Sequence, residues 1–202
     1  MSIVTHRCRC GTARFEINVP GRRAGSRVRC FCRDCQTAAR LHEDGADMLT
    51  RAGGTDIWQT TPDRLGIVAG EDHLEVLRLS PRGTYRWHAA CCGTPMANTT
   101  PRLGLPFVGI PLRQSELPEA DKVLGPVTCC AFTATARPDA GAPLRDRGFN
   151  GAVARVMTRM AAAWISGRAR HNPLRRADGA PIAPVRIISL EERIAARPEL
   201  AD

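Results

Sequence analysis

The sequence is short of large aromatic side chains and of lysine. Aromatic residues make up only 4% of the 202 residues, so aliphatic side chains and alanine must build the hydrophobic core, and such a core gains from metal cross-links. Lysine occurs once, at Lys122, and arginine supplies almost all of the positive charge behind the net charge of +9. The arginines are scattered and do not alternate with aromatic residues. This pattern favours ordinary surface charge over a nucleic-acid partner.

Long hydrophobic runs are also missing. No segment approaches the ~18 apolar residues of a membrane span, and the first 17 residues lack the apolar stretch of a signal peptide. We therefore expect a cytoplasmic protein with no membrane partner, in which thiols stay reduced. Nine cysteines with C-x-C and C-x-x-C spacings then favour metal binding over disulfide bonds.

Residues 1–135 are expected to form a mainly β domain. Phe15, Ile17 and Val19 alternate with polar residues, which is typical of a strand with one buried face. Further strands are expected within residues 27–32, after the Gly53–Gly54 pair, twice within 66–90 around a turn at 80–83, and within 107–110 and 125–136. Trp58 and Trp87 are expected in the core.

Residues 136–202 are expected to form a helical extension packed on the β domain. A segment rich in proline and glycine, residues 137–148, ends the β region. Apolar residues then recur at spacings of three and four, which predicts an amphipathic helix that stops at Gly167. Its apolar face is expected to comprise Val153, Val156, Met157, Met160, Ala161 and Trp164, with Trp164 in the core. A short strand and a last helical turn are expected within 184–197.

Two cysteine pairs point to a structural zinc site. Cys8 and Cys10 belong to a C-x-C-G turn, and Cys91 and Cys92 precede Gly93 in a second turn. A tight turn brings two sulfurs to one side, and structural Zn²⁺ takes four tetrahedral ligands. We expect the two turns to share one zinc ion, whose binding free energy then contributes to folding.

A second zinc site is expected at Cys30, Cys32 and Cys35. Their C-x-C-x-x-C spacing puts three sulfurs in one short segment. Three protein ligands and an open fourth position are typical of a zinc ion that meets water or substrate. A fourth ligand from His42 or Cys129 would close the site instead. Cys129 itself, with Cys130, lies in an apolar strand context that favours a buried, inert thiol.

The order of these motifs resembles the glutathione-dependent formaldehyde-activating enzymes, which are grouped with centromere protein V. C-x-C-G, C-x-C-x-x-C and a late C-G-T turn carry the resemblance, over roughly residues 5–100. It implies a mainly β, zinc-stapled β-tent fold similar to that of Mss4. It also implies two zinc ions, a structural one at Cys8, Cys10 and Cys92 and a catalytic one at Cys30, Cys32 and Cys35.

The last cysteine pair departs from the family pattern. The family usually shows C-x-x-C-G, which would require a cysteine where this chain has Ala89. Cys91 is therefore expected to supply the fourth sulfur of the structural site. His88, Cys129, Cys130 and a water molecule are the alternatives.

The resemblance implies a zinc-dependent carbon–sulfur lyase that acts on a small thiol–aldehyde adduct of the glutathione type. Arg29, Arg33 and Arg40 flank the triplet and could bind the carboxylates of such a thiol, although solvated surface charge is the simpler interpretation. Asp34 and His42 are the nearest candidates for a general base. The competing hypothesis is a non-catalytic, zinc-scaffolded binding module. The sequence specifies neither the substrate nor the oligomeric state.

Overall fold

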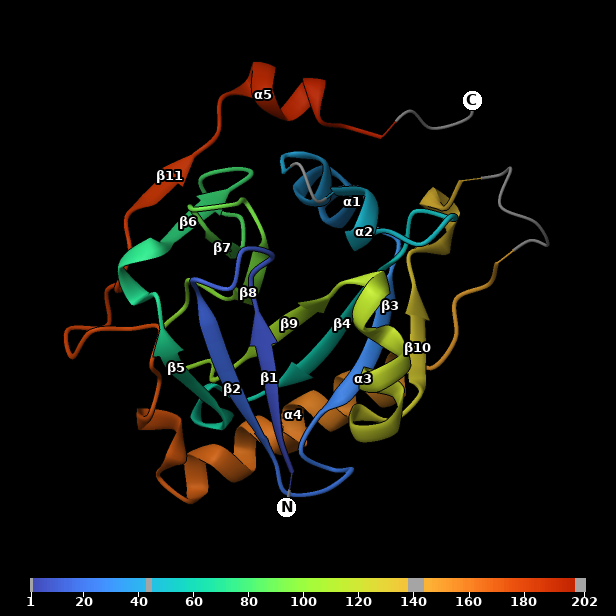
Figure 1. The fold of residues 1–202 in the computed structure, drawn as a ribbon. Helices are drawn as coiled ribbons and strands as arrows, with labels where there is room; N and C mark the ends of the chain where they lie inside the picture. Colours follow the sequence, from blue (N-terminus) through green and yellow to red (C-terminus); the bar gives the residue numbers. More distant parts are fainter. Residues whose placement is uncertain (1, 43–44, 138–143, 199–202) are drawn as a thin grey trace.

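Two β-sheets form the body of the protein (Figure 1). The structure is a computed structural model, and it describes residues 2–42, 45–137 and 144–198. The smaller sheet has three antiparallel strands in the order β1-β2-β5. These strands are β1 (Ser2–Arg7), β2 (Arg14–Val19) and β5 (Leu65–Ala69). The expected mainly β class with an added C-terminal helix is confirmed.

The larger sheet has eight strands in the order β10-β3-β4-β9-β8-β7-β6-β11. Their bounds are β3 (Ser26–Cys30), β4 (Thr55–Thr60), β6 (Leu74–Arg78), β7 (Tyr85–Ala89), β8 (Pro95–Thr99), β9 (Val108–Leu112), β10 (Val127–Ala131) and β11 (Val185–Ile187). Only the two edge strands, β10 and β11, pair in parallel with their neighbours. The predicted domain boundary at residue 135 stays a prediction, and the residues after it add β11 to this sheet.

The main hydrophobic core contains residues of both sheets. Phe15, Ile17 and Val19 of β2 are buried and alternate with more exposed polar residues, as the sequence pattern predicts. They belong to the same core cluster as Trp58 of β4 and Trp87 of β7, each of which is 1% exposed. Aliphatic residues and alanine fill most of the remaining cluster. Two large indoles therefore anchor a core that is otherwise poor in aromatic side chains.

In the described part of the chain, five α-helices lie around the sheets. They are α1 (Arg33–Arg40), α2 (Gly45–Met48), α3 (Leu117–Leu124), α4 (Phe149–Ile165) and α5 (Leu190–Ala195). Short 3₁₀ turns are η1 (Pro62–Arg64), η2 (Glu71–His73), η3 (Gln114–Glu116), η4 (Thr133–Thr135) and η6 (Arg168–Arg170). Helix α4 packs across β10, β3 and β4 (Figure 1). None of the helices in the described part of the chain is long and hydrophobic enough to cross a lipid bilayer.

Helix α4 buries a narrower face than its sequence pattern predicts. Its buried side chains are Ala152, Met160 and Ala163. Val153, Met157 and Trp164 are 47%, 57% and 55% exposed, so the expectation that Trp164 lies in the core is wrong. The indole N–H of Trp164 instead donates to the carbonyl oxygen of Gly104 at 2.8 Å. The helix crosses strands at one edge of the sheet, and a crossing of this kind covers only a thin stripe of its surface.

Candidate metal centres

Four sulfur atoms meet at one end of the smaller sheet. The Sγ atoms of Cys8, Cys10, Cys91 and Cys92 lie within 4.8 Å of one another. Cys8 Sγ lies 3.5 Å from Cys10 Sγ and 3.9 Å from Cys91 Sγ, and Cys10 Sγ lies 3.2 Å from Cys91 Sγ. Thiolates around a tetrahedral zinc ion, at ~2.3 Å from it, are about 3.8 Å apart, whereas disulfide sulfurs are ~2.05 Å apart. The spacing fits a shared metal ion rather than disulfide bonds.

Two tight turns build this four-sulfur group. One links β1 to β2 and the other links β7 to β8. Gly11 and Gly93 adopt φ values of +84° and +72°, a left-handed conformation that glycine adopts at little cost. The backbone N–H of Arg9 donates to the Thr94 hydroxyl at 3.0 Å and joins the two turns. The sulfurs are thus positioned by local backbone geometry.

Hydrogen bonds favour the thiolate form of Cys10 and Cys92, whereas burial and the neighbouring cysteines raise the pKa of Cys91 to about 12. The backbone N–H of Ala13 donates to Cys8 Sγ at 3.2 Å. Hydrogen bonds from the hydroxyl and backbone N–H of Thr12 lower the pKa of Cys10 to about 6. Burial acts in the opposite direction on Cys8 and raises the pKa of that thiol. A bound cation would offset this penalty, since metal ligation deprotonates a thiol.

Cys91 supplies a fourth sulfur to the group, in place of the cysteine that the family pattern would have at position 89. Cys91 joins Cys8, Cys10 and Cys92 in the group, and Ala89 ends β7 as a fully buried residue. The alternative ligands lie elsewhere: within the described ranges, neither of the two cysteine clusters that could hold a metal ion includes His88, Cys129 or Cys130. Cys129 and Cys130 are buried in β10, as expected.

The cysteine triplet forms a second group at the end of β3. The Sγ atoms of Cys30, Cys32 and Cys35 lie within 4.8 Å of one another. Cys30 is the last residue of β3, and Cys32 is the N-cap of α1, whose sulfur accepts from the backbone N–H of Cys35 at 3.4 Å. Cys30 is buried, whereas Cys32 and Cys35 are half-buried. A helix N-terminus carries partial positive charge that stabilises thiolates.

Arg86 is a residue at this group that the sequence analysis missed. It lies on β7, where it pairs in register with Leu77 of β6 and Asn98 of β8. Hydrogen bonds from Cys30 and Cys32 lower the pKa of Cys35, and the charge and hydrogen bond of the Arg86 guanidinium lower it further. No local sequence signal links Arg86 to the triplet, because the sheet brings it there from a distant part of the chain.

The arginines that flank the triplet in sequence point to other partners. Arg29 lies 2.6 Å from the buried carboxylate of Asp56. Arg33 is exposed at the start of α1. The guanidinium group that interacts with Cys35 is therefore that of Arg86, which leaves the roles expected of Arg33 and Arg40 as predictions.

Two further candidates connect α1 with α5 and with the residues that follow it. Arg40 donates to the backbone carbonyl of Arg197 at 3.1 Å. The carboxylate of Asp34 accepts from Arg193 at 3.2 Å. The C-terminal helix is thus held against the helix that carries Cys35, which is the side of the molecule shown at the top of Figure 1.

His42 lies between the two cysteine groups. Together with Cys35 and Arg86 it lines a cavity of about 30 Å³, which has room for about one water molecule. Its ring centroid is 4.8 Å from that of His88. A Cβ atom added to Gly93 would lie 3.4 Å from His42 Nδ1. His42 is not part of the triplet's cluster, but it lies close both to Cys35 and to the β7–β8 turn at Gly93.

His6 is a buried histidine of β1. It is 2% exposed, and its Nδ1 lies 3.8 Å from a carboxylate oxygen of Glu116. Burial lowers its pKa, and the Glu116 charge partly opposes this effect. Both residues line a cavity of about 600 Å³ that helix α3 also borders. Residues of η3 and α3, two elements that local patterns do not predict, line this cavity together with β1.

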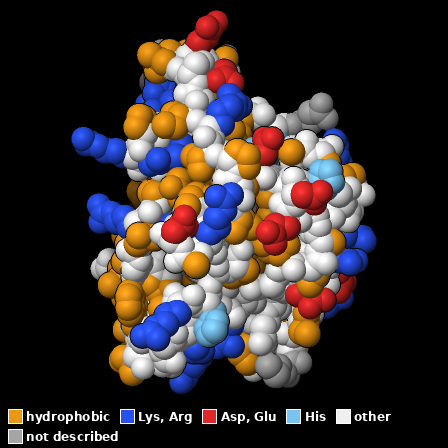
Figure 2. Space-filling model, turned by 90° about the vertical axis from the view of Figure 1, so that its left-hand side faces the viewer, with side chains coloured by type: hydrophobic (Ala, Val, Ile, Leu, Met, Phe, Trp, Pro, Cys, Tyr) orange, Lys and Arg blue, Asp and Glu red, His pale blue; other side chains and the backbone are white. Residues whose placement is uncertain are grey.

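Surface charge is mixed on the face shown in Figure 2. Basic side chains there lie among acidic and hydrophobic ones, without a continuous basic patch. Some basic and acidic side chains of the protein form ion pairs. Arg186 of β11, for example, lies 2.8 Å from Glu192 of α5. On this face the basic side chains are dispersed, as the scattered arginines of the sequence predict.

Comparisons with known proteins identify the family. A search of the curated proteins found no match. Among solved structures, a crystal structure of a Rhodobacter sphaeroides protein has 18% sequence identity and a TM-score of 0.37, and it covers 53% of this chain and 83% of that chain. Similarity at this level assigns neither fold nor function. A sequence model described as "Family of unknown function (DUF6151)" matches residues 1–186. The chain therefore belongs to the DUF6151 family.

Proposed function

We propose that this protein is a zinc enzyme of the carbon–sulfur lyase type that acts on a small thiol–aldehyde adduct. One observation carries the proposal. Three cysteine sulfurs converge at the N-terminus of α1, and the described part of the chain adds no fourth His, Cys, Asp or Glu to their cluster. Two of the three are half-buried and so within reach of solvent. The motif order, which resembles that of glutathione-dependent formaldehyde-activating enzymes, supports the substrate class.

The donor set fits Zn²⁺. Thiolates are preferred zinc ligands, and three of them leave one tetrahedral position for substrate or water. When bound, zinc would supply Lewis-acid polarisation of a substrate oxygen or sulfur. Three thiolates and one Zn²⁺ carry a formal charge of −1, and the Arg86 guanidinium beside Cys35 would offset it. The four-sulfur group, with its closed ligand set, would hold the structural zinc.

Nearby residues of the chain have defined roles in this proposal. Arg86 orients the Cys35 thiolate and stabilises negative charge on the substrate. His42 borders the same small cavity, and it is the candidate to hold or move a proton there. Helix α5, bound to α1 through Asp34 and Arg40, shields the triplet's helix on its outer side. The substrate is expected to approach from the half-buried side of Cys32 and Cys35.

A partner-binding scaffold without catalysis is the second candidate function. It is favoured by the exposed apolar row on α4, where Phe149, Val153 and Met157 are 47%, 47% and 57% exposed. These side chains border a groove of about 250 Å³ that also includes Phe132. Monomeric proteins rarely expose large apolar patches without a binding role.

Replacing Cys32 with serine separates the two functions. The Cys32→Ser variant is expected to keep its fold, lose one of two zinc ions and lose turnover by about 100-fold or more, because the reactive metal is no longer held. Turnover is measured by NMR as the enzyme-dependent interconversion of formaldehyde plus glutathione with their adduct S-hydroxymethylglutathione. The matched control is Cys130→Ser, since Cys130 is outside both groups. Unfolding of Cys32→Ser would show that the triplet is structural, and unchanged turnover would reject the lyase proposal.

A further inference from the structure

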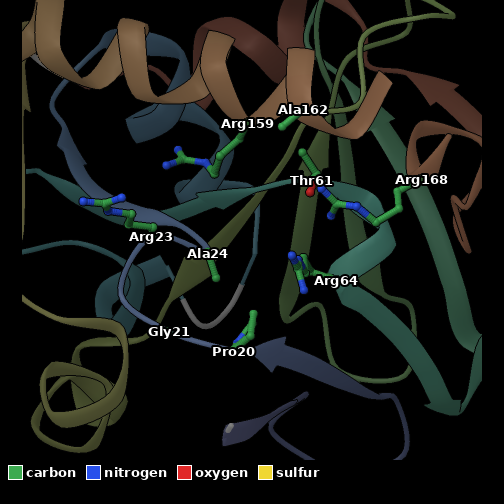
Figure 3. A pocket seen from close by; sticks show the side chains of 9 residues that line it. All are labelled: Pro20, Gly21, Arg23, Ala24, Thr61, Arg64, Arg159, Ala162 and Arg168. Atoms are coloured by element: carbon green, nitrogen blue, oxygen red, sulfur yellow. The ribbon is translucent and has the colours of Figure 1, made fainter. Parts of the chain in front are cut away.

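Four arginines line a pocket of about 350 Å³ far from the cysteines (Figure 3). They come from three parts of the chain: Arg23 from the β2–β3 turn, Arg64 from η1, and Arg159 and Arg168 from α4 and η6. In Figure 3 the side chains of Arg64 and Arg168 lie on one side of the pocket, and those of Arg23 and Arg159 lie on the other. The fold thus brings together basic residues that are far apart in the sequence.

The positive charge of this pocket is only partly neutralised. Asp63 lies 2.7 Å from Arg168 and 3.8 Å from Arg64. Within the described ranges, no carboxylate forms an ion pair with Arg23 or Arg159. Burial and the neighbouring charge of Arg155 lower the pKa of Arg159 to about 10, which shows that its surroundings disfavour the cation. An anion in the pocket would remove that penalty.

Hydrogen bonds fix two of the guanidinium groups. Arg159 donates to the Ser26 hydroxyl at 2.8 Å. Arg168 donates from Nε to the Ser166 hydroxyl at 2.9 Å and from one terminal nitrogen to Asp63 at 2.7 Å. The guanidinium groups of Arg159 and Arg168 therefore hold their remaining N–H donors in defined positions. Held arginines lose less side-chain entropy on binding than free ones do.

The turn that carries Arg23 is also fixed. The Thr60 hydroxyl donates to the backbone carbonyl of Ala24 at 2.6 Å. Gly25 lies directly against the buried indole of Trp58, so that a side chain there would collide with the ring. The backbone of the pocket is thus preformed, which is common for small-molecule sites.

The pocket is separate from the cysteine groups. Ser26, which contacts Arg159, begins β3, whereas Cys30 ends it. Four residue steps along a strand span about 13 Å. Figure 1 shows the β2–β3 turn and α4 at the bottom of the molecule and α1 at the top. A ligand in the pocket would therefore not contact the proposed zinc sites.

We propose that this arginine pocket binds a small phosphate-bearing molecule. The planar guanidinium fork matches phosphate oxygens, and several such forks around one concavity favour a group with more than one negative charge. The volume suits one or two phosphoryl groups with a small organic part. A concave pocket of this size favours a small ligand over a nucleic-acid strand, whose backbone would need an extended basic surface.

Calorimetric titration with pyrophosphate tests this proposal. The full-length wild-type protein is expected to bind pyrophosphate, and Arg159→Gln is expected to weaken the affinity about tenfold or more through loss of charge-assisted hydrogen bonds. Because Arg159 is half-buried and bonded to Ser26, its variant is checked for unchanged thermal unfolding. Arg23→Gln, at an exposed position of the turn, is expected to weaken binding in the same direction without an effect on folding.

Matched controls separate the pocket from general charge and from the metal sites. Arg82→Gln removes one exposed charge on the β6–β7 turn and is expected to change the affinity by less than about twofold. Cys32→Ser is expected to bind pyrophosphate as the wild type does, whatever its effect on turnover. No binding by the wild type, equal losses in Arg82→Gln and Arg23→Gln, or binding of a single-stranded oligonucleotide but not of pyrophosphate would overturn the proposal.

Discussion

Replacing Cys10 with serine is expected to destabilise the protein by at least about 3 kcal/mol, a fraction of the ~10–16 kcal/mol that structural zinc sites contribute. Cys10 is exposed, and substitutions at exposed positions usually change stability by less than about 0.5 kcal/mol. A large loss at this position therefore measures the metal and not packing. The loss is read from urea unfolding followed by circular dichroism.

The control for this variant is chelation of the wild type. If Cys10 holds a structural zinc ion, a strong chelator is expected to lower the unfolding midpoint of the wild type and to affect the variant much less. The four-sulfur group joins the β1–β2 turn to the β7–β8 turn across most of the N-terminal half of the chain. Substitution of Cys10 and removal of the metal by a chelator therefore both break the link between these two turns. A Cys10→Ser variant as stable as the wild type would contradict a structural metal there.

Replacing Asp56 with alanine is expected to cost about 3–5 kcal/mol, because the change removes the buried carboxylate that pairs with both Arg27 and Arg29. Asp56 is fully buried, and its carboxylate lies 3.0 Å from Arg27 and 2.6 Å from Arg29. Arg27 is 1% exposed, and it also pairs with Asp121. This network joins β3 and β4 just before Cys30, so its loss is expected to loosen the triplet as well.

An exposed ion pair provides the comparison for Asp56. Glu119 and Lys122 lie 2.7 Å apart on α3, with side chains that are 81% and 68% exposed. Glu119→Ala is expected to change the free energy of unfolding by less than about 0.5 kcal/mol. Urea unfolding of both variants gives the two values. If Asp56→Ala lost less than about 1 kcal/mol, the buried network would not hold these strands together.

Local patterns in the sequence predict much of the fold. The alternation of apolar and polar residues in β2 correctly predicts a strand with one buried face. The prediction is local, because successive side chains of a strand point to opposite faces of the sheet. The glycines after Cys10 and Cys92 mark tight turns for the same local reason. The start and end of α4 also follow from its own residues and from Gly167.

Long-range packing accounts for what the sequence did not reveal. Helix α1 was not predicted, because the sequence analysis treated the triplet only as one short segment, whereas Cys32 in fact caps a helix. Helix α3 was not predicted, and it carries Pro118 in its first turn, where proline is tolerated. Arg86 reaches Cys35, and four arginines reach one pocket, only through sheet order. No local pattern specifies such contacts.

The metal content of the purified protein tests the central claim most directly. After growth with ample zinc, elemental analysis is expected to give two zinc ions per wild-type chain and one per Cys32→Ser chain. Zinc-edge anomalous diffraction is expected to place one ion among Cys8, Cys10, Cys91 and Cys92, and the other among Cys30, Cys32 and Cys35. A wild-type protein with no zinc, or a map with a fourth protein side chain bound to the triplet's ion, would contradict this account.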